Sequence, residues 1–306
     1  MKQIAVVLVA CLIGSSLAAQ DKRTRPRITG IDHVRIYVTD IDKSSAFYSK
    51  LIGVRPKGGM CFDPSRMCFT VDWQQNQTIE LEKTPTSETK NWIAEISFAT
   101  DNVEQMRLYL MAHGMSVSKS SKYTYEKHAL YSHFEVRDPE GTPISFIQRF
   151  VYPIDDPPPG APCCVRILHA GFVVKDLAAE NHFYMDLLGF RLYWHGGFKD
   201  QDTDWYEIQV PDGNNWIEYM LNIPANADHK ELGVQNHFSL GVKDAQAAAA
   251  QLRKNGLLTF DGPEIGRDGK NSLDAYDPDG TRVEIMEFSP TQKPCCHPYT
   301  ADHPKP

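Results

Sequence analysis

Several common signatures of function are missing from this 306-residue sequence. It contains no glycine-rich phosphate loop, no serine-nucleophile motif and no heptad run, so it gives no support to the nucleotide-binding, serine-hydrolase or coiled-coil classes. Positive charge is also scarce, because 32 Lys and Arg stand against 39 Asp and Glu, and the formal net charge is −7. This balance argues against a nucleic-acid partner or an anionic membrane surface.

Long hydrophobic runs are missing too, except at the N-terminus. There Lys2 precedes an apolar run over residues 4–13 and then small residues, which is the layout of a secretory signal rather than of a membrane span. We predict a signal peptide over residues 1–19 and a periplasmic or extracellular mature protein. Losing this segment removes Lys2 and no acid, so the net charge moves from −7 to −8. Lipid anchoring at Cys11 is the alternative, although the stretch before it is short.

Six cysteines remain outside the signal segment: Cys61, Cys68, Cys163, Cys164, Cys295 and Cys296. An even count in an exported chain predicts disulfides. A bridge between the two adjacent pairs would fasten the tail, residues 290–306, to the rest of the protein, and a Cys61–Cys68 bridge would close a local loop. A thiolate metal site is the alternative, but adjacent Cys lack the spacing of zinc knuckles.

What the sequence does contain is an internal repeat. Four segments each begin with an alternating strand, continue with an amphipathic helix opened by Asp and closed by Gly, and end in shorter strands. The first and third segments keep an offset of 136 residues, which matches His33 with His169 and Tyr48 with Tyr184. We therefore predict four βαβββ units, which begin near Gly30, Trp92, Ile167 and Val234.

A Pro-rich stretch divides the units into two pairs. We predict an N-terminal domain over residues 28–150, a linker over 151–164, a C-terminal domain over 165–289 and the tail over 290–306. The two domains end in related turns and strands, DPEGTPISFIQRF and DPDGTRVEIMEF, but the first has Ser145 where the second has Glu284.

Paired βαβββ units with a His on the first strand and DPDGxxVE before the last strand resemble the vicinal oxygen chelate superfamily. This superfamily includes glyoxalase I, extradiol dioxygenases and bleomycin resistance proteins. The resemblance covers residues 30 to 289 and implies an α+β fold of two tandem domains with curved mixed sheets. It also implies one divalent metal ion that chelates adjacent oxygens of a small substrate, and it allows a homodimer.

Two His and two Glu of the third and fourth units are the candidate metal ligands. On the strands that begin at His169 and His237, small residues share the face of the imidazole and leave a hollow beside it. Glu218 and Glu284 lie among apolar residues in short strands, where a carboxylate is costly unless it is paired or bound to a cation. All four residues fall where the resemblance places ligands, and such a set suits Zn, Ni, Fe(II) or Mn.

The N-terminal domain departs from this set. It has Glu95 where the second domain has His237, and the neutral Ser145 cannot offset a dication as a carboxylate does. We predict a degenerate N-terminal site. The resemblance leaves two pairings open: the ligand set is completed within the C-terminal half, which we favour, or across the halves by His33 and Glu80.

The resemblance implies three candidate functions. A glyoxalase I-like lyase or isomerase, which we favour, would use Glu284 or Glu218 as a proton-transferring base as well as a ligand. An extradiol ring-cleaving dioxygenase would need three ligands, but the sequence departs from that signature, with Asp274 in place of a Tyr and residues 265–267 in place of a His. A non-catalytic small-molecule-binding protein of the bleomycin-resistance kind is the third candidate.

Overall fold

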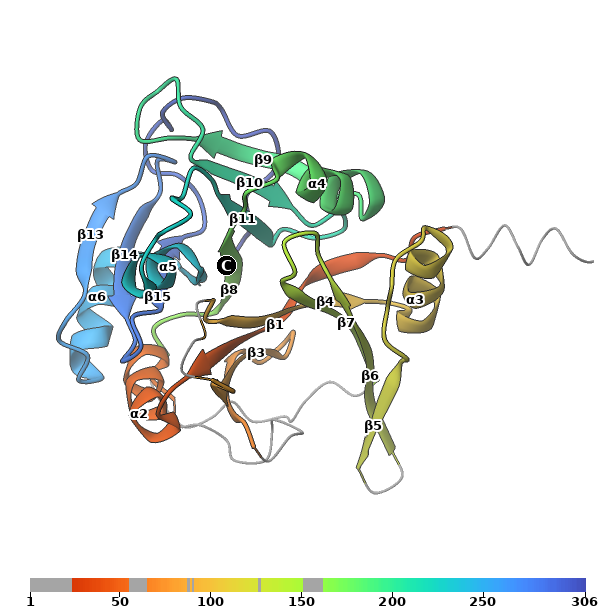
Figure 1. The fold of residues 1–306 in the computed structure, drawn as a ribbon. Coiled ribbons are helices and arrows are strands. Elements are labelled where there is room, and N and C mark those ends of the chain that lie inside the picture. The colour runs from red at the N-terminus through yellow and green to blue at the C-terminus, as the bar shows by residue number, and fades with distance from the viewer. Residues whose placement is uncertain (1–23, 55–64, 87–88, 90, 126–127, 151–161) are drawn as a thin grey trace, which may run out of the picture.

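The computed structural model of the protein describes residues 24–54, 65–86, 89, 91–125, 128–150 and 162–306. The predicted signal peptide, most of the predicted linker and Cys61 lie outside these residues, so the Cys61–Cys68 bridge stays a prediction. The described strands form two sheets, one in each half of the chain (Figure 1).

The N-terminal half is a seven-stranded sheet in the order β2-β3-β1-β4-β7-β6-β5, with two helices. Its elements are β1 (Ile28–Val38), α2 (Ile41–Ile52), β2 (Met67–Asp72), β3 (Gln77–Lys83), β4 (Ile93–Thr100), α3 (Val103–Ala112), β5 (Ser121–Tyr125), β6 (His128–Arg137) and β7 (Pro143–Arg149).

The C-terminal half is an eight-stranded sheet in the order β13-β14-β15-β12-β8-β11-β10-β9. Its elements are β8 (Arg166–Val173), α4 (Leu177–Asn181), the π-helix η1 (His182–Leu187), β9 (Arg191–Gly196), β10 (Trp205–Gln209), β11 (Trp216–Met220), α5 (His229–Gln235), β12 (His237–Val242), α6 (Ala245–Lys254), β13 (Asp261–Ile265), β14 (Asn271–Tyr276) and β15 (Arg282–Glu287).

Both sheets join their two units in the same way. In the first, β1 is parallel to β3 and antiparallel to β4, and in the second, β8 is parallel to β11 and antiparallel to β12. Units one and two therefore share one sheet, and units three and four share the other. The predicted α+β fold of two tandem domains is confirmed, and the ligand candidates of the C-terminal half meet within that half.

The helix ends follow from the Asp and Gly positions of the repeat. Asp40, Asp176 and Asp244 each precede a helix and accept a backbone N–H of its first turn. Gly53 ends α2 at a positive φ of 80°, which a residue without a Cβ adopts easily. The repeat does not predict the change from α4 to the π-helix η1, nor the extra helix α5 before β12.

The two halves exchange a pair of hydrogen bonds. Tyr48 of α2 donates to Asp277 in the turn before β15, with an O···O distance of 3.1 Å. Tyr184 of η1 donates in the same way to Asp138 in the turn before β7, at 3.2 Å. Both tyrosines are buried, and one hydrophobic core runs through both halves. The matched turns of the repeat therefore serve as contacts between the halves.

The predicted bridge between the two cysteine pairs is wrong, because Cys163 bonds to Cys164 and Cys295 to Cys296. The pairs lie in different places: the Cys163 N–H donates to the carbonyl of Ile52 at the end of α2, whereas the Cys295 N–H donates to the carbonyl of Arg267 between β13 and β14. Neither pair offers a free thiolate to a metal.

Other contacts hold the tail against the C-terminal sheet. Tyr299 donates to Asp268 Oδ2 at 3.0 Å, and Tyr193 Oη lies 2.7 Å from His303 Nδ1. The rings of Tyr193 and Tyr299 also pack against each other, with their centroids 4.8 Å apart. The tail is therefore part of the C-terminal domain rather than a free extension.

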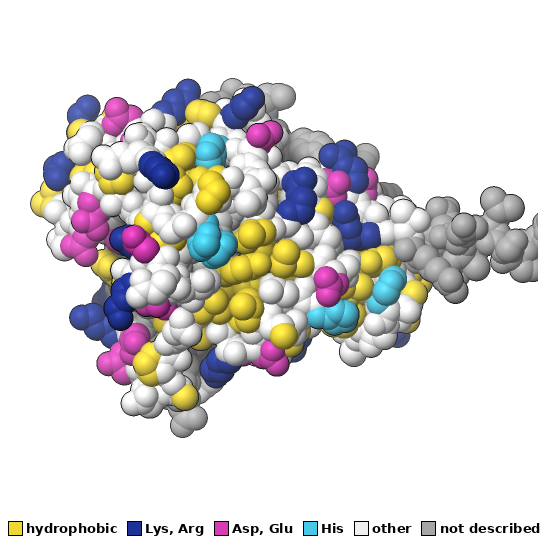
Figure 2. Space-filling model, turned by 90° about the horizontal axis from the view of Figure 1, so that it is seen from above, with side chains coloured by type: hydrophobic (Ala, Val, Ile, Leu, Met, Phe, Trp, Pro, Cys, Tyr) yellow, Lys and Arg dark blue, Asp and Glu magenta, His cyan; other side chains and the backbone are white. Residues whose placement is uncertain are grey.

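The surface carries charges of both signs. Figure 2 shows a hydrophobic patch near the middle of one face, bordered by His side chains, with Lys, Arg, Asp and Glu scattered around it. Within the described residues, no helix is both long and apolar enough to cross a membrane.

Candidate metal centre

The four candidate ligands lie on four neighbouring strands of the C-terminal sheet. Glu218 of β11 and His237 of β12 both pair with Gly171 of β8, one from each side. His169 of β8 and Glu284 of β15 both pair with the same residue of β12. The structure therefore brings all four side chains to one place on the sheet.

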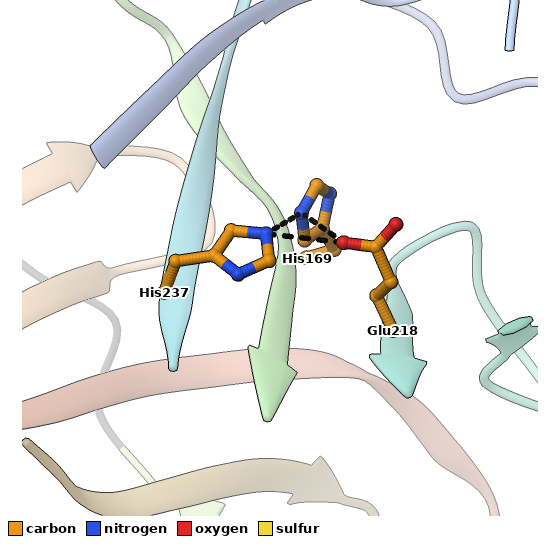
Figure 3. A group of neighbouring side chains, drawn as sticks. All are labelled: His169, Glu218 and His237. Carbon is orange, nitrogen blue, oxygen red and sulfur yellow. Dashed lines mark hydrogen bonds and ion pairs between the residues drawn. The ribbon is translucent and has the colours of Figure 1, made fainter. Parts of the chain in front are cut away.

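The donor atoms of three of these side chains, His169, Glu218 and His237, converge (Figure 3). His169 Nε2 lies 3.1 Å from His237 Nε2 and 3.7 Å from Glu218 Oε2, and His237 Nε2 lies 3.1 Å from the same oxygen. Glu284 Oε2 lies 3.4 Å from His169 Nε2. Ligand atoms bound about 2.1 Å from one ion are roughly 3.0 Å apart in octahedral and 3.4 Å apart in tetrahedral geometry. The distances among His169, Glu218 and His237 therefore fit one coordination sphere. Glu284 approaches His169 but lies outside this group of three, so it would have to move to become a fourth ligand.

Gly171 makes room for the second imidazole. A Cβ built on this glycine would lie 2.1 Å from Cε1 and 2.5 Å from Nδ1 of His237. The ring therefore occupies the space that a side chain at position 171 would need. The hollow expected beside His169 is filled by the other histidine rather than left open.

The contacts of His237 indicate which ring nitrogen carries the hydrogen. Nδ1 lies 3.0 Å from the carbonyl oxygen of Gln235, so Nδ1–H donates there and Nε2 keeps a lone pair. Glu218 Oε2 lies 3.1 Å from the same nitrogen. Two lone pairs at this distance repel each other unless a cation or a proton lies between them. A metal ion would turn this contact into a stabilising one.

Burial keeps both imidazoles in the form that binds metals. It lowers the pKa of His169 well below the ordinary value, and the neighbouring positive charges add to this effect. Burial and the charge of Arg282 together lower the pKa of His237. The burial of Glu284 has the opposite effect and raises the pKa of its carboxyl to about 8, with Arg282 opposing. Two neutral imidazoles and two carboxyls fit a divalent first-row ion.

The ligand set opens into a cavity of about 230 Å³. Glu218 and Glu284 both line it, which gives a small molecule access to the ligands. Most other lining groups are polar or aromatic: Trp194, Trp205, Glu207, Glu264, Arg267, Asp268, Ser272, Asp274 and Arg282.

Two cavity residues that sequence reasoning missed lie close to the ligands. Glu207 of β10 pairs with Glu218 across the sheet and is 2% exposed, and burial raises its pKa well above the ordinary value. Arg282 Nη2 lies 2.8 Å from His237 Nε2. The sequence did contain a signal for each. Glu207 is an acid in the alternating strand WYEIQ, and Arg282 stands two residues before Glu284, on the same face of β15.

A buried lysine also lies near the site. The Lys270 side chain is 0% exposed, and its Nζ lies 4.4 Å from the ring centroid of Trp216 and 3.2 Å from Asp268 Oδ2. The Trp216 ring packs on His169, with centroids 4.9 Å apart. Tyr299 of the tail faces the same ammonium group at 4.9 Å. The tail therefore contributes to the packing behind the first ligand.

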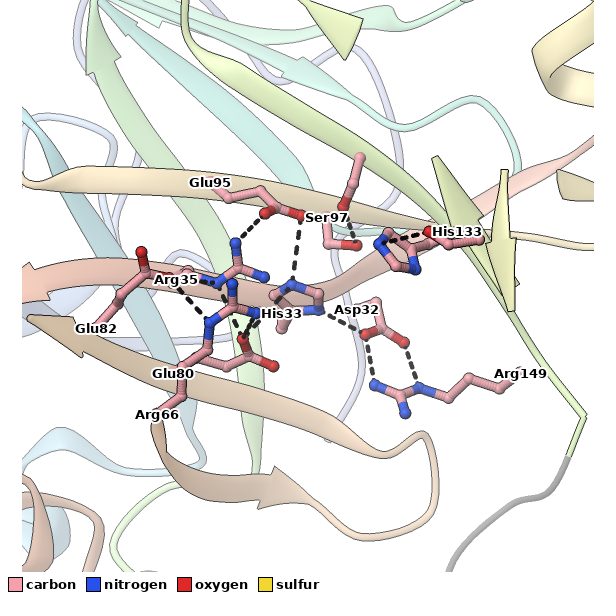
Figure 4. A network of polar contacts seen from close by, with 12 residues as sticks. Asp32, His33, Arg35, Arg66, Glu80, Glu82, Glu95, Ser97, His133 and Arg149 are labelled. Carbon is pink, nitrogen blue, oxygen red and sulfur yellow. Dashed lines mark hydrogen bonds and ion pairs between the residues drawn. The ribbon is translucent and has the colours of Figure 1, made fainter. Parts of the chain in front are cut away.

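The N-terminal sheet has an ion-pair network at the corresponding place (Figure 4). Arg35, the counterpart of Gly171, pairs with Glu80 of β3 and Glu95 of β4. Its guanidinium donates to Glu95 and, at 3.1 Å, to Glu80 Oε2. Ser145, the counterpart of Glu284, donates instead to Ser97 at 2.8 Å. Protein cations balance these carboxylates.

His33 differs from its counterpart in charge. Burial alone would lower the pKa of His33, but the neighbouring carboxylates of Glu80, Asp32 and Glu95 outweigh burial and raise the pKa to about 9. Its Nδ1 lies 2.9 Å from Asp32 Oδ1, and Arg149 holds the same carboxylate at 2.6 Å. The imidazolium has no lone pair to offer a metal.

A family model supports the assignment that this geometry suggests. The model described as the Glyoxalase/Bleomycin resistance protein/Dioxygenase superfamily matches residues 30–146 and 166–285, which is most of the chain. The chain belongs to this superfamily. No curated protein matches the sequence of this superfamily member.

Solved structures with the same fold include two kinds of enzyme. A variant of homoprotocatechuate 2,3-dioxygenase from Brevibacterium fuscum has a TM-score of 0.63 at 17% identity, covering 92% of this chain and 74% of the other. The Mn(II)-bound glyoxalase from Novosphingobium aromaticivorans has a TM-score of 0.62 at 20% identity, covering 86% and 83%. At such identities, the likeness of the superfamily member to these enzymes shows the fold alone.

Proposed function

We propose that the protein is an exported, metal-dependent lyase or isomerase of the glyoxalase I kind. The observation that carries this proposal is the convergence of His169, Glu218 and His237 at separations of 3.1 to 3.7 Å, with Glu284 beside them at 3.4 Å from His169. A divalent ion held by these residues would supply Lewis-acid polarisation of two adjacent substrate oxygens. The substrate class is a small molecule with a hydroxyl next to a carbonyl.

Glu284 is the group that transfers the proton. Its carboxyl lines the cavity, so a substrate bound there could reach it as a base. One oxygen takes the proton from the hydroxyl-bearing carbon, and the same carboxyl returns it to the former carbonyl carbon. The hydroxyl proton passes to the former carbonyl oxygen, so the hydroxyl and the carbonyl exchange places. This isomerisation needs no oxidant or reductant. Glu218, which faces the same cavity, is the alternative base.

Ring cleavage of a catechol is the second candidate, because the fold also resembles that of a dioxygenase. The cavity favours the first candidate. A fourth protein ligand, Glu218, leaves fewer positions for substrate and dioxygen, and Asp274 lines the cavity where the ring-cleaving signature has a Tyr.

The test begins with protein over residues 20–306, stripped with a chelator and reloaded separately with Zn, Ni, Mn and Fe(II). We expect about one ion per chain and conversion of the methylglyoxal–glutathione hemithioacetal to lactoylglutathione, which Glu284→Gln abolishes. Catechol cleavage under Fe(II) without isomerisation would support the second candidate. Failure to bind any ion would leave the third candidate, a non-catalytic binding protein.

Export is a separate part of the proposal and rests on the signal-like residues 1–19. Expression of the full chain in a bacterium should yield processed protein in the periplasm or medium. Mass spectrometry of the purified N-terminus would detect the cleavage, and an intact cytoplasmic chain would contradict export.

A further inference from the structure

Arg282 lies where it can compete with a metal ion. It begins β15, and its Nη2 approaches the lone-pair nitrogen of His237 at 2.8 Å. Its Nε donates to the carbonyl of Val234 at 3.1 Å, so the base of the guanidinium is anchored. One lone pair can accept a hydrogen bond or bind a metal, but not both. Guanidinium does not lose its charge in proteins, so this competition persists at every working pH.

The same side chain has a second partner on the cavity side. Asp274 Oδ2 lies 3.7 Å from Arg282 Nη1, and both residues line the cavity. A small rotation of the outer guanidinium would exchange the contact with His237 for a closer one with Asp274. The anchor at Val234 would remain.

The N-terminal half contains a cation that carboxylates hold from both sides. Arg35 is held there by Glu80 and Glu95, which lie on strands on either side of it. The position that matches Arg282 in the repeat is Pro143, which carries no charge. Among the residues that the structure describes, Arg282 forms an ion pair with one carboxylate, that of Asp274 at 3.7 Å, so it is held less firmly than Arg35.

We propose that Arg282 is a built-in competitor of the metal, which stabilises the ligand set in the metal-free protein and turns to Asp274 when an ion binds His237. This inference rests on the proposed function, because it requires a metal bound by His237 together with His169 and Glu218. It makes Arg282 a positioning residue that sets the affinity for the metal.

The test compares the metal affinity of Arg282→Leu with that of the wild-type protein. Titration of chelator-treated protein with zinc should give a Kd about tenfold lower or more in the variant, because a charge-assisted hydrogen bond no longer has to break. Arg267→Leu is the matched control: it lines the same cavity and pairs with Asp200, and its zinc Kd should not change. An equal or weaker affinity in Arg282→Leu would overturn the inference alone, whereas no binding by any of the proteins would overturn the proposed function as well.

Nuclear magnetic resonance provides a measurement that does not depend on catalysis or on the folding of a variant. In the metal-free wild-type protein, the 15N shift of His237 Nε2 should be that of a nitrogen accepting a hydrogen bond, and the Arg282 Nη–H signals should exchange slowly with water. Zinc should change both sets of signals together. Zinc binding to His237 with no change at Arg282 would overturn the inference.

Discussion

At the centre of the C-terminal sheet, Gly171 lies between Glu218 and His237, whereas at the corresponding place in the N-terminal sheet Arg35 lies between Glu80 and Glu95. The glycine admits an imidazole ring and adds no charge. The arginine fills the same space and neutralises both neighbours.

The charge of the first-strand histidine follows from this difference. Carboxylates surround His33 and raise its pKa to about 9 against the effect of burial, whereas burial among positive neighbours lowers the pKa of His169 well below its ordinary value. The same fold therefore holds a salt-bridge network in one half and a set of candidate metal ligands in the other. The difference depends on a few positions, such as Arg35 and Gly171.

The largest effect should come from removing a candidate metal ligand from the C-terminal half, compared with removing a histidine from the N-terminal half. His237→Ala should lower the affinity for zinc by on the order of 100-fold or more, because even partners outside the coordination sphere contribute 10- to 100-fold. His33→Ala, the mutation in the other half, should leave zinc affinity unchanged. Isothermal titration of both variants checks this, and loss of metal in His33→Ala would show that the halves share one site.

The next largest effect should be on stability. Arg35→Met removes the arginine between Glu80 and Glu95 and leaves them His33 and, for Glu80, Arg66. The free energy of unfolding should therefore fall by somewhat less than the roughly 3–5 kcal/mol that a wholly uncompensated buried charge costs. Arg66→Met removes a more exposed arginine, which pairs with Glu82 at 2.9 Å and reaches Glu80 only at 3.7 Å, and it should cost less than about 1 kcal/mol. Urea denaturation at pH 7 measures both, and equal costs would argue against the special role of Arg35.

Another difference between the halves predicts a pH dependence. Glu180 is fully buried where the repeat has Ser44 in the first half, and burial, with a contribution from Asp138, raises its pKa to about 8. The native state therefore holds this proton between about pH 4.5 and 8 while the unfolded state has lost it. The stabilising contribution of protonated Glu180 to the free energy of unfolding is complete below pH 4.5 and is lost as the pH rises through 8.

Glu180→Gln should therefore reduce the fall in stability over this pH range, by up to a few kcal/mol at pH 8. Ser44→Ala should leave the pH dependence of unfolding as it is in the wild-type protein. Thermal unfolding from pH 5 to 9 compares the three proteins, and parallel curves for all of them would contradict the assignment.

The smallest effect should come from adding one methyl group at Gly171, beside the candidate metal ligands. Gly171→Ala forces the His237 ring to move, which should cost about 1–3 kcal/mol in stability and weaken zinc binding. Ser239→Ala is the control, because it changes a neighbouring buried residue without meeting the ring. Unchanged zinc affinity in Gly171→Ala would show that the ring adapts easily.

The repeat made much of this architecture predictable. A constant offset between His33 and His169 set the alignment of the units, and strand alternation then placed the four candidate ligands on one face. Pairing of the units within each half, which the family resemblance left open, was decided by the contact between β8 and β12.

The other features of the site depend on contacts between residues far apart in the sequence, which patterns and spacings do not reveal. The role of Arg282 depends on a rotamer that reaches a residue 45 positions away. Lys270 is buried against expectation for its residue type, because aromatic rings from the sheet and the tail enclose it. The cysteine count suggested disulfides but not their connectivity, and the pairing between distant cysteines was wrong.

The exchanged hydrogen bonds from Tyr48 to Asp277 and from Tyr184 to Asp138 make the two halves depend on each other. Deleting the N-terminal half would remove the tyrosine that contacts the turn before Glu284 and the Asp138 carboxylate that accepts from Tyr184. The half without the candidate metal ligands therefore supports the half that carries them.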